Sequence, residues 1–349
     1  MRPDAGASRP MRAASLVCLA LLACAVIPRS PILAEKKPRQ EGASPIESGH
    51  KLISDLGCPV CHEIPGAETA VREEAPDLSF EGQLVRPDWL FSFLKSPHRI
   101  RPAVKGRMPD FRLTDEEALA ITEYLVSLND PEAPEVPEER RYKGAPAPVL
   151  VEAGRRLTSP EYLSCFKCHI LGDQRPGGEP SEWAPDLARV RQRLMPEGIL
   201  SWIRNPPGYR PNTKMPVFFP DQDSGPEDIL GGDEELLMTA LRDFVMSIGL
   251  DRSFDGLAEA RAAFPWVRPS DGRSLMVKLN CVGCHNVADL PDGKKVGPSL
   301  GAEGSRVRPE WLAEFLGRPW TIKPEYELMG SLARMPDFHL SGDEMKLVT

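Results

Sequence analysis

Three short stretches of the sequence place two cysteines three residues apart, with a histidine directly after the second. They read Cys58-Pro-Val-Cys61-His62, Cys165-Phe-Lys-Cys168-His169 and Cys281-Val-Gly-Cys284-His285. This pattern is the attachment signature of c-type haem, because two thiols on one helical turn can each bond to a vinyl group of one porphyrin. The imidazole that follows then lies under the iron as the proximal ligand. The sequence therefore predicts three covalently attached haem c groups, held by these six cysteines, with the three histidines on the irons.

Two other uses of paired cysteines fit less well. A structural zinc site needs four Cys or His ligands, and each cluster here offers three. A thioredoxin-like redox pair would lie in a βαβ pattern, which the sequence does not show. Three copies, each with its histidine in the same place, also argue against a chance match.

A Met-Pro pair follows each attachment motif at a nearly constant distance. A thioether is a soft, neutral ligand suited to haem iron, and Met/His ligation raises the reduction potential of the haem. We therefore expect one distal methionine in each copy of the motif. The pairs are Met108-Pro109, Met215-Pro216 and Met335-Pro336, which lie 46, 46 and 50 residues after the motif histidine.

The third methionine has a competitor. Met329 lies 44 residues after His285, so its spacing alone leaves it open as a ligand. We prefer Met335, because Met335-Pro-Asp-Phe338 repeats Met108-Pro-Asp-Phe111.

Two further residues could be mistaken for distal ligands. Met195 also precedes a proline, but it lies only 26 residues after His169 and before the helix expected next. His98 would suit a distal imidazole in the first copy, but it has no counterpart in the others.

The motifs mark an internal repeat of domain size, roughly 110 residues long. In each copy a short helix with an early glycine precedes the cysteines, and a Pro-x-Leu element follows the histidine. An amphipathic helix with proline in its first turn comes next, and a capped helix closes the copy. The glycines are Gly49, Gly154 and Gly272; the Pro-x-Leu prolines are Pro76, Pro185 and Pro298; the amphipathic helices begin at Pro87, Pro196 and Pro309; the closing helices begin near Thr114, Gly232 and Ser341.

The order of these elements resembles class I cytochrome c, three times over. The resemblance implies a mainly α fold of three tandem helical domains, each wrapped around one haem. It also implies that the early glycines let the first helix cross close to the last, with Tyr124 and Phe244 at that crossing. The carbonyls of Pro76, Pro185 and Pro298 would accept a hydrogen bond from the proximal histidine and fix its orientation.

We expect the domains to span residues 45–130, 150–250 and 270–349, joined by linkers at 131–149 and 251–269. The first linker is rich in Pro and Glu and should be extended and stiff. Residues 256–263 could form a short helix in the second linker. The sequence ends at Thr349, inside the last expected helix. We therefore expect that helix to be truncated here and more protein to follow.

Residues 1–34 have the order of a secretory signal peptide. Arg2, Arg9 and Arg12 precede an apolar run at 13–27, and small residues end at Ala34. An uncleaved anchor and lipidation at Cys24 are the alternatives. Export fits the attachment motif, so we expect a periplasmic or otherwise extracytoplasmic protein. Any membrane association would come through this segment or through a larger complex.

The charge of the chain bears on its partners. The formal net charge is −8, and removing residues 1–34 leaves 39 basic and 50 acidic side chains, or −11. An acidic protein is a poor partner for nucleic acid and for anionic lipid. It suits a redox protein with a basic docking face, although the charge also serves plain solubility.

The function that these patterns favour is electron transfer. Three irons with both axial positions filled leave no open site for substrate, and they can pass single electrons along a chain of domains. The alternative is a haem enzyme, peroxidase-like or nitrite-reductase-like, with one open iron. Such an open iron would most readily lie in the third copy, where the Met-Pro pair is farther from the motif histidine and two methionines are candidate ligands. We see no other catalytic constellation.

Overall fold

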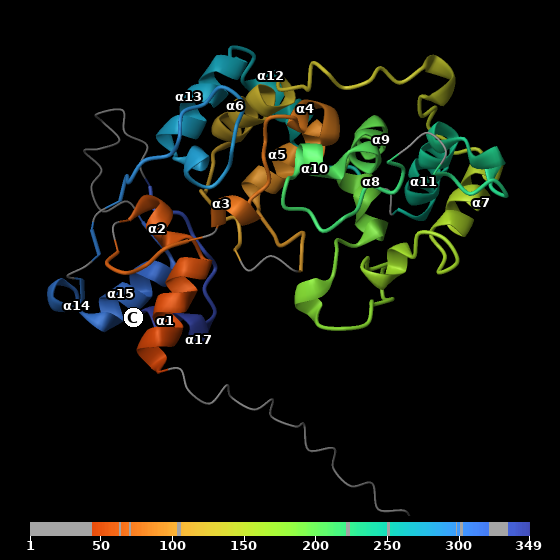
Figure 1. Cartoon of the computed structure of the whole chain (residues 1–349). Coiled ribbons are helices and arrows are strands. Elements are labelled where there is room, and N and C mark those ends of the chain that lie inside the picture. The colour runs from red at the N-terminus through yellow and green to blue at the C-terminus, as the bar shows by residue number, and fades with distance from the viewer. Residues whose placement is uncertain are drawn as a thin grey trace, which may run out of the picture. The chain divides into compact units, whose positions relative to one another are not determined.

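The computed structural model describes residues 44–62, 64–69, 71–102, 106–220, 224–249, 252–297, 299–300, 303–320 and 334–349. In these ranges the chain is mainly helical, and its strand-like contacts are isolated bridges rather than a sheet (Figure 1). The expected mainly α fold class is confirmed. The expected signal peptide at 1–34 lies outside the described residues, and so do Pro298 and Met329.

The first copy begins with a helix that the sequence caps strongly. Ser44 accepts a hydrogen bond from the Glu47 amide, while Glu47 bonds back to the Ser44 amide, and proline occupies the first turn. Thr114 and Glu117 form the same capping box on the closing helix. The helices of this copy are α1 (Pro45–Asp55), α2 (Cys58–Cys61), α3 (Val71–Glu74), α4 (Glu81–Leu84), α5 (Pro87–Lys95) and α6 (Asp115–Val126).

The second copy repeats this order with a different cap. Its closing helix begins after Asp233, whose side chain accepts a hydrogen bond from the Leu236 amide. We expected Gly232 in that role. The carboxylate takes it because it can satisfy a free amide of the first turn, which glycine cannot. The helices are α7 (Pro148–Leu157), α8 (Val190–Arg193), α9 (Pro196–Arg204), α10 (Pro206–Tyr209) and α11 (Glu234–Ile248), with short 3₁₀ turns between them.

The third copy and the linker before it supply the remaining helices. The short helix expected at 256–263 is present as α12 (Leu257–Ala263). Ser341 and Glu344 form the expected capping box on the last helix. The helices of the copy are α13 (Pro269–Lys278), α14 (Glu303–Arg306), α15 (Pro309–Gly317) and α17 (Gly342–Val348).

The second copy closes on itself. Its first helix, α7, packs along its last, α11, and the two lie side by side in Figure 1. A β-carbon on Gly154 would collide with the Ala240 carbonyl oxygen and the Phe244 side chain. Glycine is therefore required for this close crossing. The buried cluster between Ala153 and Met246, which we name core B, is drawn mostly from this copy.

The first and third copies instead exchange halves. The first helix of the third copy, α13, packs along α6, the last helix of the first copy. A β-carbon on Gly272 would collide with the Ala120 carbonyl oxygen and the Tyr124 side chain. The resulting buried cluster, core A, combines residues 85–125 of the first copy with residues 257–287 of the linker and the third copy.

The other two halves also meet. Helix α1 packs against α17, and α17 also contacts α15, as Figure 1 shows. A β-carbon on Gly49 would collide with the Leu347 carbonyl oxygen. We name this group of α1, α15 and α17 core C. Its aromatic side chains form a compact group, in which Trp311 stacks on Phe315 with ring centroids 5.3 Å apart and Trp320 meets both edge-on.

This packing corrects one expectation. Residues 45–130 and 270–349 do not each close around their own first and last helices in the described part of the chain. The crossing glycines do what we expected, but Gly49 and Gly272 do so with the other copy. The physical reason is that the repeats present equivalent helices to one another, so that local sequence permits either partner. The positions of the domain boundaries in the sequence stay a prediction.

The first linker, which we expected to be extended and stiff, makes specific contacts with the second copy. Arg140 forms an ion pair with Glu235 at 3.1 Å, and its carbonyl accepts a hydrogen bond from Arg242 at 2.6 Å. Tyr142 lies under the Arg242 guanidinium. The buried Arg242–Asp243 pair gives the linker a polar partner on α11, so this stretch packs against core B.

Cores A and B meet at equivalent positions of the first and second copies. Val85 and Leu194 form an antiparallel bridge, flanked by hydrogen bonds from the Arg86 amide to the Arg193 carbonyl and from the Met195 amide to the Leu84 carbonyl. A β-carbon on Gly198 would lie 2.7 Å from the Gln83 carbonyl oxygen. The start of α9 can therefore approach α4 closely only with glycine at this position.

Candidate haem-binding sites

Each attachment motif forms one tight turn. The histidine amide donates to the carbonyl of the first cysteine in all three copies, at 3.0 Å for His62, 2.9 Å for His169 and 3.0 Å for His285. Such a turn places both thiols and the imidazole within reach of one porphyrin. The six motif cysteines are free thiols, as thioether attachment requires.

Two of the three motif histidines are oriented as the family resemblance implies, and one of these by the other copy. His169 Nδ1 lies 2.9 Å from the Pro185 carbonyl oxygen of its own copy. His285 Nδ1 lies 2.9 Å from the carbonyl oxygen of Pro76, in the first copy. Donation from Nδ1 fixes the ring and leaves Nε2 with its lone pair for a metal. The carbonyl of Pro76 thus has its expected role with an unexpected histidine.

His62 also lies against the third copy. A β-carbon on Gly297 would collide with the His62 imidazole, and the Gly297 amide donates to the Cys61 carbonyl at 2.8 Å. Gly297 directly precedes Pro298, the proline expected to hold a proximal histidine. The segment that follows His285 in the sequence therefore lies against the histidine of the first copy.

Burial sets the protonation of these groups. It lowers the pKa of His169 and of His285, although the proline carbonyls oppose the shift. Both imidazoles are therefore neutral at pH 7, which is the form that binds iron. Burial raises the pKa of Cys58 and Cys165 to about 11, and that of Cys281 to about 12. These groups are thus protonated thiols at pH 7.

Two of the three Met-Pro methionines pack against a buried core. Met215 packs against core B and accepts a hydrogen bond from Trp202 Nε1 at 3.0 Å. Met108 packs against core A, and so does Cys281 of the third copy. Met335 lies shortly before α17, the last helix of core C. Ligation by these methionines stays a prediction, as does the choice of Met335 over Met329.

The two Met-Pro loops of the first and third copies are paired with each other. The Asp110 amide donates to the Asp337 carbonyl and the Asp337 amide to the Asp110 carbonyl, both at 2.7 Å. Arg112 and His339, two residues farther along each loop, both have positive φ, at 50° and 49°. The loops are therefore related by a local two-fold symmetry.

Two arginines extend this symmetry. Arg107 bonds to Glu344 at 2.5 Å and reaches the His339 carbonyl at 3.4 Å. Arg334 bonds to Glu117 and reaches the Arg112 carbonyl at 3.3 Å. Each arginine directly precedes its methionine, and each glutamate closes the capping box of the opposite copy's last helix. Our sequence analysis expected the two glutamates to cap these helices, but it missed both arginines and the pairing between the copies. The signal was the sequence Arg-Met-Pro-Asp-Phe, which occurs in the first and third copies but not in the second.

The attachment turns of the first and third copies also touch. A β-carbon on Gly283 would collide with Val60 Cγ1, and Asn280 Nδ2 lies 3.4 Å from Cys61 Sγ. Lys295 donates to the Pro59 carbonyl, and Arg72 bonds to Asn286 at 3.1 Å. Groups attached at Cys61 and Cys284 would therefore be close neighbours.

The apolar surroundings fit a porphyrin. Trp89 stacks on Phe93 with centroids 4.8 Å apart in core A, and Trp311 and Phe315 form the equivalent pair in core C. Trp202 has the same place in core B. Cores A and B each combine a Cys-x-x-Cys-His turn, an aromatic helix and the methionine of a Met-Pro pair, and core C combines such a turn with the aromatic helix α15. Thiols, imidazole and thioether are the groups that haem c needs.

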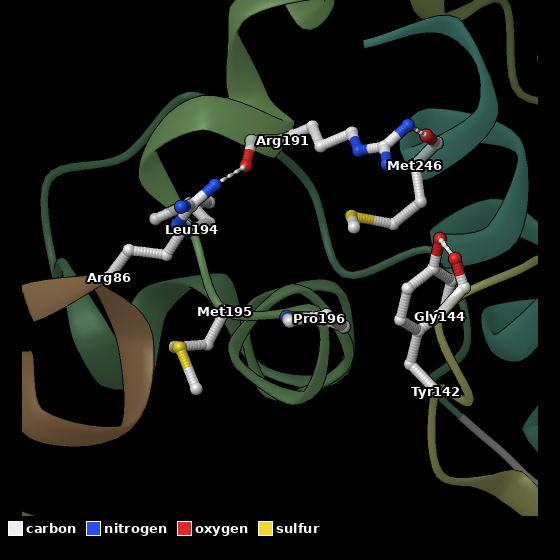
Figure 2. A pocket seen from close by; sticks show the side chains of 8 residues that line it. All are labelled: Arg86, Tyr142, Gly144, Arg191, Leu194, Met195, Pro196 and Met246. Atoms are coloured by element: carbon white, nitrogen blue, oxygen red, sulfur yellow. Dashed lines mark hydrogen bonds between the residues drawn. The ribbon is translucent and has the colours of Figure 1, made fainter. Parts of the chain in front are cut away.

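A cavity of about 290 Å³ lies elsewhere, between α9, the first linker and Arg86 of α5's N-terminus. Figure 2 shows Arg86 donating to the Arg191 carbonyl and Arg191 donating to the Met246 carbonyl. Met195 lines this cavity at the start of α9. None of the motif cysteines or histidines lines it, so it is no part of the attachment sites.

Among the described residues, no helix is long and apolar enough to span a bilayer. No cluster of three or more His, Cys, Asp or Glu side chains in those ranges could by itself hold a metal ion.

The comparison with protein families agrees with the motifs. Residues 46–129 and 269–349 match the family described as Cytochrome c. No curated protein and no solved structure matches the chain. The chain therefore carries cytochrome c domains in at least two regions, and with the Cys-x-x-Cys pairs these imply bound haem c and haem-based electron transfer. Both matches are contiguous in sequence, which fits an exchange of halves because exchange leaves the order of elements unchanged.

Proposed function

We propose that the protein is an exported tri-haem c-type cytochrome that passes single electrons between redox partners, as a carrier or as the cytochrome subunit of a respiratory or dehydrogenase complex. The observation that carries this proposal is the attachment turn and Met-Pro pair of each copy, together with a motif imidazole held by a proline carbonyl in two of them. The second copy is included because its His169 makes the same bond to a proline carbonyl as His285 does.

The residues of the chain divide the work in this proposal. The cysteines would hold the porphyrins, and His62, His169 and His285 would bind the irons through Nε2. Met108, Met215 and Met335 would fill the sixth positions and exclude other ligands. Bound haem supplies the one-electron change of its iron, and the protein tunes its potential through ligands and burial.

The setting is proposed on charge and on the leader-like segment. An extracytoplasmic location suits covalent haem attachment and the signal-peptide order of residues 1–34. The acidic surface favours a redox partner with a basic docking face, because opposite charges steer protein encounters. Nucleic acid is not proposed as a partner.

The test is a haem count combined with ligand spectroscopy on the exported protein. We expect three haems per chain, a long-wavelength Met–Fe(III) band scaled to three sites, and no change on adding carbon monoxide to the reduced protein. A haem count below three would contradict the tri-haem assignment. Rapid carbon monoxide binding at one haem would mean an open iron, and the haem enzyme would then replace the electron carrier.

A further inference from the structure

We propose that the first and third copies share their axial ligands crosswise. In this arrangement His285 and Met108 bind one iron, while His62 and Met335 bind another. His169 and Met215 of the second copy bind the third iron. The inference rests on the proposed haem ligation, and it deepens that ligation by assigning the pairs.

The contacts in core A support the pairing of His285 with Met108. His285 is held by the Pro76 carbonyl at 2.9 Å, and Cys281 packs against the same buried cluster as Met108. The helix before the cysteines, α13, crosses the helix after Met108, α6, at Gly272. Every element that a single-haem site needs is thus present in core A, drawn from two copies.

The contacts in core C support the pairing of His62 with Met335. His62 lies against Gly297, at the start of the Pro-x-Leu element of the third copy. The helix before its cysteines, α1, crosses α17, the helix that follows Met335. Met335 lies six residues before Ser341, the residue that caps α17.

The contacts between the two sites support the exchange. The chain crosses from core C to core A after His62 and returns after His285. The two crossings are tied together by Arg72 with Asn286 and Asp292, and by the Leu78 amide with the Asn286 carbonyl at 2.9 Å. Each Met-Pro loop is also held by an arginine and a glutamate of opposite copies. These bonds join the two cores where the chain crosses between them and at the Met-Pro loops.

The test labels one haem at a time in the intact three-haem protein. Replacing one motif cysteine, as in Cys58→Ala or Cys281→Ala, leaves one vinyl group unreacted and conjugated with the porphyrin. The reduced absorption band of that haem then moves to longer wavelength. Its reduction potential can be followed at that wavelength while each distal methionine is replaced in turn.

Loss of a methionine ligand lowers the potential of its own haem, because Met/His ligation raises it. We expect Met335→Leu to lower the potential of the haem labelled by Cys58→Ala, and Met108→Leu to leave it unchanged. With the Cys281→Ala label the two effects should be reversed. If the Cys58→Ala haem responds to Met108→Leu and not to Met335→Leu, the exchange is wrong.

Two control experiments accompany this measurement. Cys165→Ala with Met215→Leu tests a pair that lies within one copy whether or not the others are exchanged. Met195→Leu should shift none of the haems. If a leucine variant fails to load three haems, Met335→His and Met108→His keep a ligand on the iron and still lower its potential. The crosswise pairing also fails if Met215→Leu lowers the potential of the haem in the second copy, while neither Met108→Leu nor Met335→Leu lowers the potential of the His62 haem. If Met215→Leu also has no effect, methionine ligation itself fails, and the proposed function fails with it.

Discussion

The second copy and the joined first and third copies solve the same packing problem in two ways. In core B the helix before the cysteines returns to the closing helix of its own copy, at Gly154. In cores A and C the equivalent helices cross the closing helices of a partner copy, at Gly272 and Gly49. The glycine meets a helix carbonyl at an equivalent position each time. The crossing is therefore a property of the repeat, while the choice of partner is not.

What differs between the copies lies in the Met-Pro loops. The first and third loops read Arg-Met-Pro-Asp-Phe, and their arginines and backbones pair across the two copies. The second loop reads Lys214-Met-Pro-Val217-Phe, and both Lys214 and Val217 are exposed. Among the described residues the second loop forms no such pairing, and its copy closes on itself. The comparison teaches that a few loop residues distinguish a self-contained repeat from an exchanged one.

The largest loss of stability should come from replacing a glycine at a helix crossing. Gly272→Leu should destabilise core A by about 3 kcal/mol or more, because the new side chain must separate α13 from α6 and a packed crossing cannot absorb it. Gly154→Leu should do the same to core B alone. Denaturant unfolding followed at the haem bands measures both.

The control for these variants is Gly177→Leu, since nothing lies within 4 Å of a β-carbon at Gly177. It should change the unfolding free energy by less than about 0.5 kcal/mol. A Gly272→Leu protein as stable as this control would contradict the close crossing.

The arginines of the paired loops should give a smaller effect. Arg334→Ala removes hydrogen bonds to Glu117 and to the Arg112 carbonyl from a half-buried site, and should cost about 1–2 kcal/mol. Lys214→Ala, at the equivalent place in the second copy, should be nearly neutral. A double-mutant cycle of Arg334→Ala with Glu117→Gln isolates the pair, and a coupling energy near zero would remove the loop pairing as the difference between the copies.

Contact between the attachment turns should be visible in redox titrations. Reducing one haem of a close pair makes reduction of its neighbour harder, because both gain negative charge. Gly283→Val should weaken this interaction, since its side chain would push against Val60 and separate the turns. Lys167→Val, at the same motif position in the second copy, should leave it unchanged. An unaltered interaction in Gly283→Val would show that the turns do not set it.

The junction of cores A and B should make stability depend weakly on pH. Burial raises the pKa of Glu81 to about 7, against the pull of Arg193. Because the folded pKa lies above the unfolded one, the proton stabilises the fold below about pH 4.5. That stabilisation is lost as pH rises through 7. Unfolding free energies measured from pH 5 to 8 should fall, and Glu81→Gln should flatten the curve. A fall of equal size in Glu81→Gln would assign it to other groups.

Much of this architecture could be predicted from the sequence, because local signals fix local structure. Ser44, Thr114 and Ser341 cap the helices where the capping boxes indicate. The Cys-x-x-Cys-His turns and the crossing glycines need only short-range patterns. The hydrogen bond between His169 and Pro185 follows from the family resemblance, since both belong to one copy.

The partner of each half could not be predicted in the same way. Gly49 and Gly272 occupy equivalent positions in equivalent helices, so their sequences alone do not say which closing helix each will cross. The decision depends on long-range contacts such as Arg107 with Glu344, which join residues more than two hundred positions apart. Such long-range contacts leave no repeating pattern in the sequence. The one indication of them is that the first and third copies have arginine before the methionine, whereas the second copy has Lys214.

The most direct test of the exchange is photo-crosslinking from Tyr124 in the intact protein. Gly272 of α13 lies against the Tyr124 side chain, so a benzoylphenylalanine at this position should capture the peptide that contains residues 269–278. The same probe at Phe244 should capture residues 148–157 of its own copy and serves as the control. Mass spectrometry of the digested products identifies the captured peptide. Capture of residues 269–278 from position 124 is the result that the exchange predicts, and capture of residues 45–55 instead would contradict it.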